Sequence, residues 1–286
     1  MTPTTTRRDI AVGIDPVRNW HLALAWAVDE AHLRGVELRL VVAVPPQNDP
    51  QHIDAAPRHL AQRQAGTDAL RTALAWAHAR QPAMEATSSL LDGAPAGVLG
   101  GLSHEAGMIV LGSRHLSRTE EFLSAGSLVV PVTAQAHCPV VVVGDAEHVT
   151  QVTPYLVVGV DGSESSRAAL AWAFEEADLR RCALRAIAVW QPPVFSLQSG
   201  DTLFQAERRL LSETTAGRAE TYPDVRLTHE VLIGSPVETL ANAAEHALAV
   251  VVGRRGRGGY TGMRVGSVVH GLLHRAHCPV ITVPAG

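Results

Sequence analysis

The sequence contains an internal repeat, which limits the chain to two copies of one domain fold. The segment IAVGIDPVRNWHLALAWAVDEAHLRG, from Ile10, matches LVVGVDGSESSRAALAWAFEEADLRR, from Leu156. The tetrapeptide HCPV recurs near the end of each copy, at His137 and at His277. Because the order of these matches is kept over a period of about 140 residues, the repeat is a duplicated domain and not a solenoid.

The chain is long enough to bury a hydrophobic core in each copy. It has 286 residues, of which 46% are hydrophobic, and single domains commonly contain about 100–150 residues. The two copies meet near residues 144–154, a polar segment that ends in proline. We therefore predict two domains, residues 1–148 and residues 149–286.

Strands and helices alternate within each copy. In the second copy, YLVVGV is almost wholly apolar, as expected for a strand buried on both faces. Behind Ser163, a residue type favoured at helix N-caps, Leu170, Phe174 and Ala177 recur at helical spacing. We expect strands at residues 155–161, 183–190, 225–234, 248–253 and 279–283, and helices at residues 163–181, 201–220, 236–247 and 266–276. This alternation predicts an α/β fold with two tandem, doubly wound, five-stranded parallel-sheet domains.

A glycine-rich loop follows the fourth expected strand of the second copy, at the edge where such sheets bind ligands. Its spacing is Gly253-x2-Gly256-x9-Gly266, with Ser267 next at the start of the last expected helix. Free amides at a helix start attract phosphate oxygens, and glycine permits positive φ and close approach of the backbone. The sequence predicts a phosphate-binding loop; the alternative is a mobile, solvated loop whose glycines only turn the chain.

All 24 basic residues are arginines. The absence of lysine excludes a P-loop lysine, a Schiff-base lysine and a lysine general base. Arg254, Arg255 and Arg257 would instead supply positive charge to the glycine loop. The formal net charge of −4 argues against a nucleic-acid-binding surface, and the turn GVDGSESS lacks the GxGxxG dinucleotide motif.

The glycine spacing, GVDGS after the first strand and HCPV before the last strand resemble the ATP-binding universal stress proteins. The resemblance covers both copies, so the chain is similar to the tandem, two-domain members of that family found in actinobacteria. It implies a Rossmann-like fold of the adenine nucleotide alpha hydrolase type. It also implies a bound adenine nucleotide, ATP, with or without Mg²⁺.

The resemblance further implies roles for single residues of the second copy. Asp161 would contact the adenosine, and Val189 would hydrogen-bond the adenine through its backbone. Val252 and Gly253 would flank the ribose and the phosphates. The residues around the phosphates would be Gly256, Arg257, Gly266, Ser267 and Val268. For Asp161 an alternative stays open, a helix-capping carboxylate that contacts no ligand.

The first copy keeps only part of this pattern. The counterparts of the site residues are Asp15, Ala43, Gly112, Gly126 and Ser127. His115 replaces the second glycine, one extra residue follows it, and Glu120 and Glu121 add negative charge. A Cβ where positive φ is needed costs about 1–3 kcal/mol. We expect weak or lost binding here with the helix start at Gly126 retained; alternatively, His115 points to solvent and binding persists.

Two further groups of residues are given structural roles. His270, His274 and His277 lie on and just after the last expected helix, but no carboxylate completes a metal-ligand set, so we expect solvent-facing histidines and no metal site. Trp26 and Trp172 are expected to pack in the core.

The cysteines do not suggest a disulfide framework. Cys138, Cys182 and Cys278 are odd in number and form no CxxC motif. We expect Cys138 and Cys278 to be small buried hydrophobes at strand starts.

Together these features favour a nucleotide-sensing regulatory module in a stress, growth or dormancy response, acting through a signalling partner that the sequence does not name. Asp161 is the one acidic residue that the pattern fixes near the second loop, so we expect no enzymatic activity beyond weak ATP hydrolysis. The alternatives are a slow ATP hydrolase and a scaffold with vestigial sites. The intact second loop argues against the scaffold.

Location and assembly follow from the apolar segments. No apolar run approaches the roughly 18 residues of a membrane span, and the amino terminus lacks the apolar core of a secretory signal. We expect a cytoplasmic protein without membrane contact.

The last expected strands, from Pro139 and from Pro279, would be exposed apolar edges in isolated domains. We expect them to pair as an intrachain pseudo-dimer, which a proline at Val141 or Ile281 would test; a homodimer of chains is implied by the resemblance alone.

Overall fold

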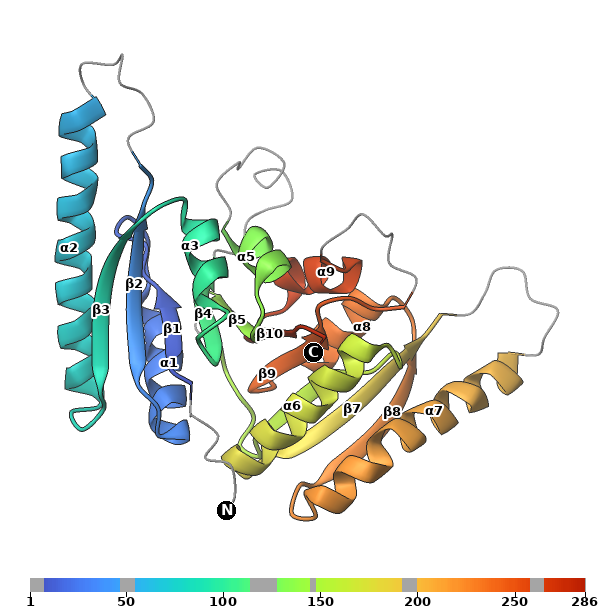
Figure 1. The fold of residues 1–286 in the computed structure, drawn as a ribbon. Helices are drawn as coiled ribbons and strands as arrows, with labels where there is room; N and C mark the ends of the chain where they lie inside the picture. Colours follow the sequence, from blue (N-terminus) through green and yellow to red (C-terminus); the bar gives the residue numbers. More distant parts are fainter. Residues whose placement is uncertain are drawn as a thin grey trace, which may run out of the picture. The chain divides into compact units, whose positions relative to one another are not determined.

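The computed structural model describes residues 8–46, 55–113, 128–144, 148–191, 200–257 and 265–285; for residues 55–56 and 200–203 it describes the backbone only. These residues form two compact units, divided near residue 145. Each unit is a parallel sheet with helices packed on both faces (Figure 1). The predicted fold, two doubly wound α/β domains, is confirmed.

The described residues of the first unit include five parallel strands in the spatial order β3-β2-β1-β4-β5. The strands are β1 (Ile10–Gly13), β2 (Leu38–Val44), β3 (Ala86–Asp92), β4 (Met108–Ser113) and β5 (Val140–Gly144). The helices are α1 (His21–Arg34), α2 (Ala55–Arg80), α3 (Pro95–Leu102) and α5 (Val129–Gln135). α1 packs against α2, and α3 packs against α5.

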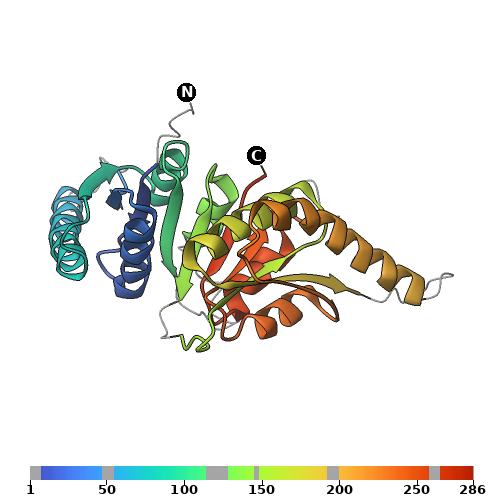
Figure 2. The ribbon, with the colours of Figure 1, turned by 90° about the horizontal axis from the view of Figure 1, so that it is seen from below.

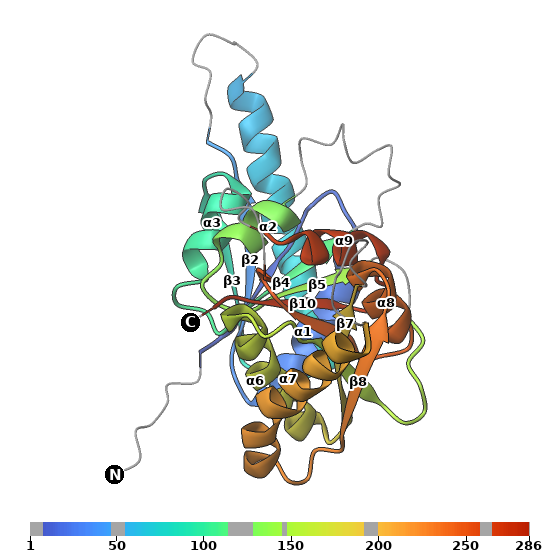
Figure 3. The ribbon, with the colours of Figure 1, turned by 90° about the vertical axis from the view of Figure 1, so that its right-hand side faces the viewer.

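The second unit repeats this plan, and its described strands have the order β10-β9-β6-β7-β8. The strands are β6 (Tyr155–Gly159), β7 (Ala183–Trp190), β8 (Leu227–Ile233), β9 (Ala249–Gly253) and β10 (Val280–Val283). The helices are α6 (Glu164–Arg180), α7 (Gly200–Thr221), α8 (Pro236–Ala243) and α9 (Ser267–Arg275). α6 packs against α7 on one face of the sheet, and α8 packs against α9 on the other (Figures 2 and 3).

The strand order of the second sheet reverses between β6 and β9. From β6 the chain continues to β7 and β8 in one direction, whereas β9 and β10 lie on the other side of β6. Val158 of β6 accordingly pairs with Ala186 of β7 and with Val251 of β9. In sheets of this class the ligand crevice lies beyond the carboxyl ends of the strands at such a reversal. The corresponding reversal in the first unit lies between β1 and β4.

The position of α6 is set by its cap and by its apolar face. The Ser163 side chain accepts a hydrogen bond from the Ser166 amide (3.1 Å), which confirms the predicted N-cap. Leu170, Phe174 and Ala177 are each at most 1% exposed, so the predicted apolar face is also confirmed.

The two tryptophans of the repeat lie outside the core, so that prediction was wrong. Trp26 and Trp172 are both only half-buried. Trp172 is two residues away from Leu170 and from Phe174, which corresponds to about 200° around a helix. It therefore lies away from the face that α6 buries.

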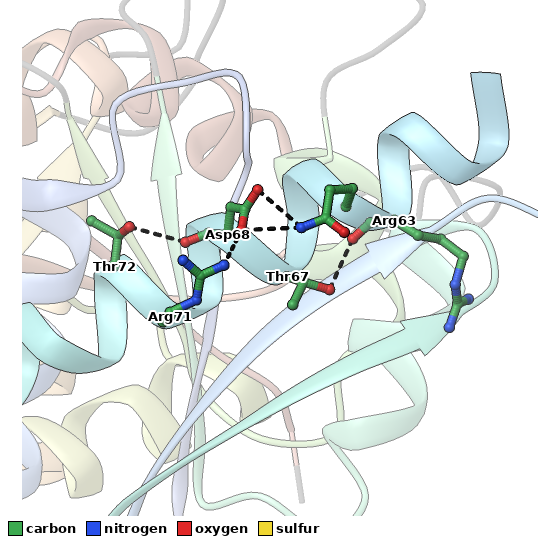
Figure 4. A network of polar contacts seen from close by, with 6 residues as sticks. Arg63, Thr67, Asp68, Arg71 and Thr72 are labelled. Carbon is green, nitrogen blue, oxygen red and sulfur yellow. Dashed lines mark hydrogen bonds and ion pairs between the residues drawn. The ribbon is translucent and has the colours of Figure 1, made fainter. Parts of the chain in front are cut away.

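The long helix α2 carries polar side chains that bond to one another along its surface (Figure 4). Asp68 accepts hydrogen bonds from Gln64 (3.2 Å) and from Arg71. Thr72 donates to the backbone carbonyl of Asp68 (2.9 Å). The two side-chain pairs of Asp68, four and three residues apart, each stabilise a helix by about 0.2–0.5 kcal/mol.

Two helices differ from their predicted bounds. α8 ends at Ala243 because residues 244–247 form a tight turn, in which the Ala247 amide donates to the Ala244 carbonyl (3.0 Å). α5 begins at Val129, whereas the helix start was predicted at Gly126, which lies outside the described residues. Pro131 favours a start at Val129, because it has no amide to donate and is tolerated in the first turn of a helix but not further in.

Among the described residues, no helix has both the length and the apolar content that a bilayer span requires.

Candidate functional site

The candidate site of the second unit lies where β6 and β9 end. Asp161 follows β6 by two residues, and Gly253 is the last residue of β9. Because β6 and β9 are neighbouring parallel strands, both residues lie at the sheet edge where the strand order reverses. The segment from residue 254 to residue 265, here called the arginine loop, leads from β9 to α9. Of this loop, residues 258–264 lie outside the described part of the chain.

Two of the three motif glycines lie too close to neighbouring atoms to leave room for a side chain. A Cβ on Gly253 would lie 2.5 Å from the carbonyl carbon of Ser165, in the first turn of α6. A Cβ on Gly256 would lie 2.5 Å from Oδ2 of Asp161. Both distances are too short for a real side chain, so the turn after β6 and the start of α6 pack directly on the loop backbone.

The third motif glycine closes the loop at its base. The Gly266 amide donates to the Arg254 carbonyl (2.9 Å). A Cβ on Gly266 would come no closer than 3.3 Å to that carbonyl oxygen. None of the three motif glycines has positive φ, whereas Gly162, in the turn after β6, has a φ of 77°. The motif therefore depends on close approach of the backbone and not on left-handed backbone conformations.

Asp161 joins the turn after β6 to the arginine loop. Its Oδ1 accepts a hydrogen bond from the Ser163 amide (2.9 Å), and its Oδ2 accepts one from the Arg257 amide (2.7 Å). Burial alone would raise the pKa of the Asp161 carboxyl. Hydrogen bonds from Ser163, Arg257 and Ser166 outweigh burial, and the pKa lies below its ordinary value of 3.8. The carboxyl is therefore charged at neutral pH.

Two serines in the first turn of α6 contact the same loop. The buried Ser165 hydroxyl donates to the Val283 carbonyl (3.2 Å) and accepts from the Arg255 amide (3.3 Å). The Ser163 hydroxyl donates to the Arg255 carbonyl (3.3 Å). The sequence prediction missed the role of Ser165, although its replacement by Asn19 at the aligned position of the first copy was a usable signal.

The start of α9 offers backbone amides at the base of the loop. The first intrahelical bond runs from the His270 amide to the Gly266 carbonyl (3.0 Å). The amides of Ser267, Val268 and Val269 thus precede the helical ladder, and Gly266 has no side chain that could cap them. Amides at the positive end of a helix dipole bind anions.

Positive charge gathers around the turn between β6 and α6. The Arg257 guanidinium lies against Gly162, where a Cβ would collide with it. Arg167 donates to the Gly162 carbonyl (2.8 Å). The pKa of Arg254 is lowered mainly by burial and to a smaller extent by the positive charge of Arg255. Because arginines remain charged in proteins, an anion bound here would relieve their mutual repulsion.

Val189 lies beside the same crevice, one residue before the end of β7. Backbone groups of successive strand residues face alternate neighbouring strands. The Ile187 carbonyl accepts from the Val160 amide (2.9 Å), on the side of β6. The backbone groups of Val189 therefore face the same side, beyond the last residue of β6. Val252, 3% exposed, is buried within β9.

The family profile that matches this chain is that of the Universal stress protein family, at residues 6–144 and again at residues 155–284. The chain belongs to the universal stress protein family. Universal stress protein Rv2623 of Mycobacterium tuberculosis (strain H37Rv) is 36% identical over 285 residues, which is 95% of each chain. Universal stress protein Rv2005c of the same strain is 33% identical over 294 residues, or 98% of each chain. A crystal structure of a universal stress protein from Archaeoglobus fulgidus has the same fold, with a TM-score of 0.74 at 18% identity over 98% of this chain and 97% of that one.

In the first domain of this universal stress protein, the aligned aspartate has a different second partner. Oδ1 of Asp15 accepts from the Val17 amide (2.9 Å), as Oδ1 of Asp161 does from Ser163. Oδ2 of Asp15 instead pairs with the Arg18 guanidinium (3.3 Å) on the surface.

The first helix of the first domain, α1, begins later than the aligned helix α6 of the second domain. α1 begins at His21, three residues later in the aligned copies than α6, and its N-cap, Trp20, makes no side-chain capping bond. A Cβ on Gly112 would lie 3.6 Å from the Ala23 side chain, an ordinary contact. A Cβ on the aligned Gly253 would lie 2.5 Å from the backbone of Ser165. The close approach of the helix backbone to this glycine is thus found in the second domain and not in the first.

The other first-domain candidates fall into two groups. Ala43 lies in β2, and because the Ile14 amide donates to the Val41 carbonyl (2.8 Å), the backbone groups of Ala43 also face β1, as those of Val189 face β6. The candidates outside the described residues are Gly126 and Ser127, together with His115, Glu120 and Glu121.

The histidines of α9 differ partly from prediction. His270 and His277 are exposed as predicted, but His274 is half-buried. The His274 ring stands edge-on to the His270 ring, with centroids 4.8 Å apart. Within the described part of the chain, no three His, Cys, Asp or Glu side chains are grouped so that they could hold a metal ion.

The cysteines of this universal stress protein are buried free thiols. Burial raises the pKa of Cys138 and of Cys278 to about 12, and that of Cys182 to about 11. The prediction of small buried hydrophobes before the last strands is confirmed, and such thiols are poor nucleophiles at neutral pH.

Proposed function

We propose that the second domain binds an adenine nucleotide, ATP, in the crevice beyond β6 and β9. The observation that carries this proposal is that two kinds of anion-binding group meet at the point where the strand order reverses. One is the set of backbone amides that precede the helical ladder of α9, and the other is the set of arginines around the loop. The orientation of the Val189 backbone supports an adenine beside β7. A Mg²⁺ accompanying the nucleotide would be held by phosphate oxygens, because both oxygens of Asp161 accept backbone hydrogen bonds.

The bound nucleotide would serve sensing and not turnover. The lowered pKa of Asp161, an acidic group beside the crevice, makes it a weak general base. We therefore expect hydrolysis to be slow or absent. In this proposal the protein acts in the cytoplasm as a nucleotide-dependent regulator of a stress, growth or dormancy response and passes its state to a protein partner. The two domains pair within the chain, and chains associate as homodimers.

Analysis of bound nucleotide tests the proposal. The purified full-length chain is denatured, and the released small molecules are identified by chromatography and mass spectrometry; ATP is then titrated calorimetrically. Gly266→Ala and Asp161→Ala should abolish retention of ATP. Their first-domain counterparts, Gly126→Ala and Asp15→Ala, should leave it unchanged.

Two outcomes would contradict the proposal. Undiminished binding in Gly266→Ala and Asp161→Ala would refute the site. No binding by the unmodified chain at about 1 mM ATP, a concentration that detects even weak affinities, would favour a scaffold with vestigial sites.

A further inference from the structure

We propose that Asp161 is a positioning residue, which fixes the start of the arginine loop through contacts within the protein. We further infer that the second glycine of the motif, Gly256, is required by this carboxylate and not by a ligand. The effect on nucleotide affinity rests on the proposed function, whereas the internal contact does not.

Asp161 bonds two segments that are distant in sequence at once. Its oxygens accept from the amide of Ser163, at the start of α6, and from the amide of Arg257, beyond β9. Hydrogen bonds from backbone amides to an ionised carboxylate are about twice as strong as neutral ones. One side chain thus ties the loop to the turn after β6.

The Asp161 carboxylate leaves no room for a side chain at residue 256. The oxygen that accepts from Arg257 is Oδ2, and a Cβ on Gly256 would lie 2.5 Å from that same atom. An alanine at this position would have to push Oδ2 away from the Arg257 amide. Asp161 and Gly256 are therefore two parts of one contact.

The first domain differs at both of the positions that are aligned with this contact. The residue aligned with Gly256 is His115, which has a Cβ. In that domain the aligned aspartate, Asp15, keeps its bond from the residue two positions later but directs its second oxygen to Arg18. Among the described residues, the carboxylate of the copy that lacks this glycine is therefore paired with Arg18.

The contact also sets where loop charge is presented. The Arg257 amide is held by Asp161, while the guanidinium of the same residue lies against Gly162. Removing the Asp161 carboxylate would free both groups. Asp161 would therefore affect anion binding through the position of the loop.

Amide hydrogen exchange in the nucleotide-free, full-length protein tests the contact directly. Asp161→Ala should speed exchange at the Arg257 amide by about tenfold or more, as expected when one charge-assisted hydrogen bond is lost. Asp15→Ala, the matched control, should leave that amide unchanged. Unchanged exchange at Arg257 in Asp161→Ala would overturn the proposal.

A double-mutant cycle tests the coupling between the two residues. Gly256→Ala should lower the urea midpoint in the unmodified chain and in Asp161→Asn, where the amide side chain still fills the space. It should have little further effect in Asp161→Ala, where the colliding atom is gone. Gly266→Ala, whose nearest neighbours do not include Asp161, should have the same effect in every background. Equal effects of Gly256→Ala in all three backgrounds would refute the coupling.

Nucleotide affinity separates positioning from direct contact. If Asp161 and Gly256 act only through one shared contact, Asp161→Ala, Gly256→Ala and the double variant should lose similar factors of ATP affinity. Losses that multiply in the double variant would assign Asp161 to the ligand and overturn the positioning role. If the unmodified chain binds no nucleotide, the proposed function fails, and the exchange and stability results still decide the internal contact.

Discussion

Aligned glycines of the two copies meet very different neighbours. Gly253 ends β9 against the backbone of Ser165, whereas Gly112, in β4, would tolerate a methyl group beside Ala23. Residue identity is the same at both positions, but only in the second domain does the helix after the first strand press on the glycine. The need for glycine thus depends on the neighbouring element and not on the backbone conformation of the residue itself.

This difference predicts unequal costs for the same substitution. Gly253→Ala should destabilise the second domain by about 1–3 kcal/mol, because the new Cβ must displace well-packed backbone. Gly112→Ala should change stability by less than about 0.5 kcal/mol. Urea unfolding of the two variants and the unmodified chain measures both values. Equal losses would show that the two glycines have similar surroundings.

The lowered pKa of Asp161 predicts an acid-dependent contribution to stability. Because its pKa is lower in the folded chain than in the unfolded chain, the carboxylate stabilises the fold fully above its unfolded value, near 3.8. That contribution is lost as the pH falls through the folded value. Unfolding free energies of the unmodified chain and of Asp161→Asn should therefore differ by a constant amount between about pH 7 and pH 5 and converge below about pH 4. A difference that persists undiminished at about pH 3 would contradict the assignment.

At the scale of single elements, prediction from sequence succeeded where the signal was local. The cap at Ser163 and the spacing of Leu170 and Phe174 predicted α6, because both are set within a few residues of the chain. The prediction of a helix start at Gly126, outside the described residues, did not weigh Pro131, which is tolerated only in the first turn of a helix such as α5.

The contacts of the site could be predicted only in part. The motif spacing located the loop, and the alternation of strands located the sheet edge. The bond between Asp161 and the Arg257 amide could not be predicted, because it joins residues far apart in sequence and depends on the register of β6 against β9. The same holds for the orientation of the Val189 backbone, which depends on where β6 stops.

The cap of α6 predicts a further measurable effect. Ser163→Ala removes the acceptor of the Ser166 amide and should destabilise α6 by about 1 kcal/mol, whereas Ser163→Gly should cost only a few tenths. Thermal unfolding compares the two variants. Val17→Ala, at the aligned position of the first copy, is the control, because Val17 is 92% exposed and should tolerate the change. A larger loss in the glycine variant than in the alanine variant would contradict the capping role.

At the scale of the whole molecule, the two domains share a sheet plan but differ in their candidate sites. In the second domain, Asp161 and the first turn of α6 bond to the arginine loop. In the first domain, Asp15 pairs with its neighbour Arg18, and α1 begins one turn later. Both of these differences lie at the edge of the sheet where ligands bind.

We therefore expect one strong nucleotide site per chain. Calorimetric titration with ATP should give a stoichiometry near one, with a much weaker or absent second event. Gly266→Ala should remove the strong event, and Gly126→Ala should not. Two sites of equal affinity would show that His115 and the extra loop residue are harmless.

The pairing of the two last strands within the chain stays a prediction, and the structure corrects the positions that test it. The Ile109 amide donates to the Pro139 carbonyl (3.0 Å), so the Val141 amide faces β4 inside its own sheet. By the same alternation, the Ile281 amide faces β9. A proline at either position would break the domain's own ladder.

The amides of Val142 and Thr282 face the opposite way and are the informative positions. A proline at either should loosen the two halves. Small-angle scattering of the unmodified chain should fit a rigid pair of domains, and the proline variants should give a more extended profile. Freely hinged domains in the unmodified chain would refute the pairing.

The contacts of the arginine loop have a consequence for how this protein can evolve. They reach the turn after β6 and the first turn of α6, but they do not form the hydrophobic core between sheet and helices. A gene that encodes two such domains can accumulate changes in one loop while the other continues to serve the organism. In the first domain α1 begins about one turn later than α6 does, and the domain still forms a five-stranded sheet. Ligand binding by one half of the protein can thus be lost or altered during evolution while the fold is kept.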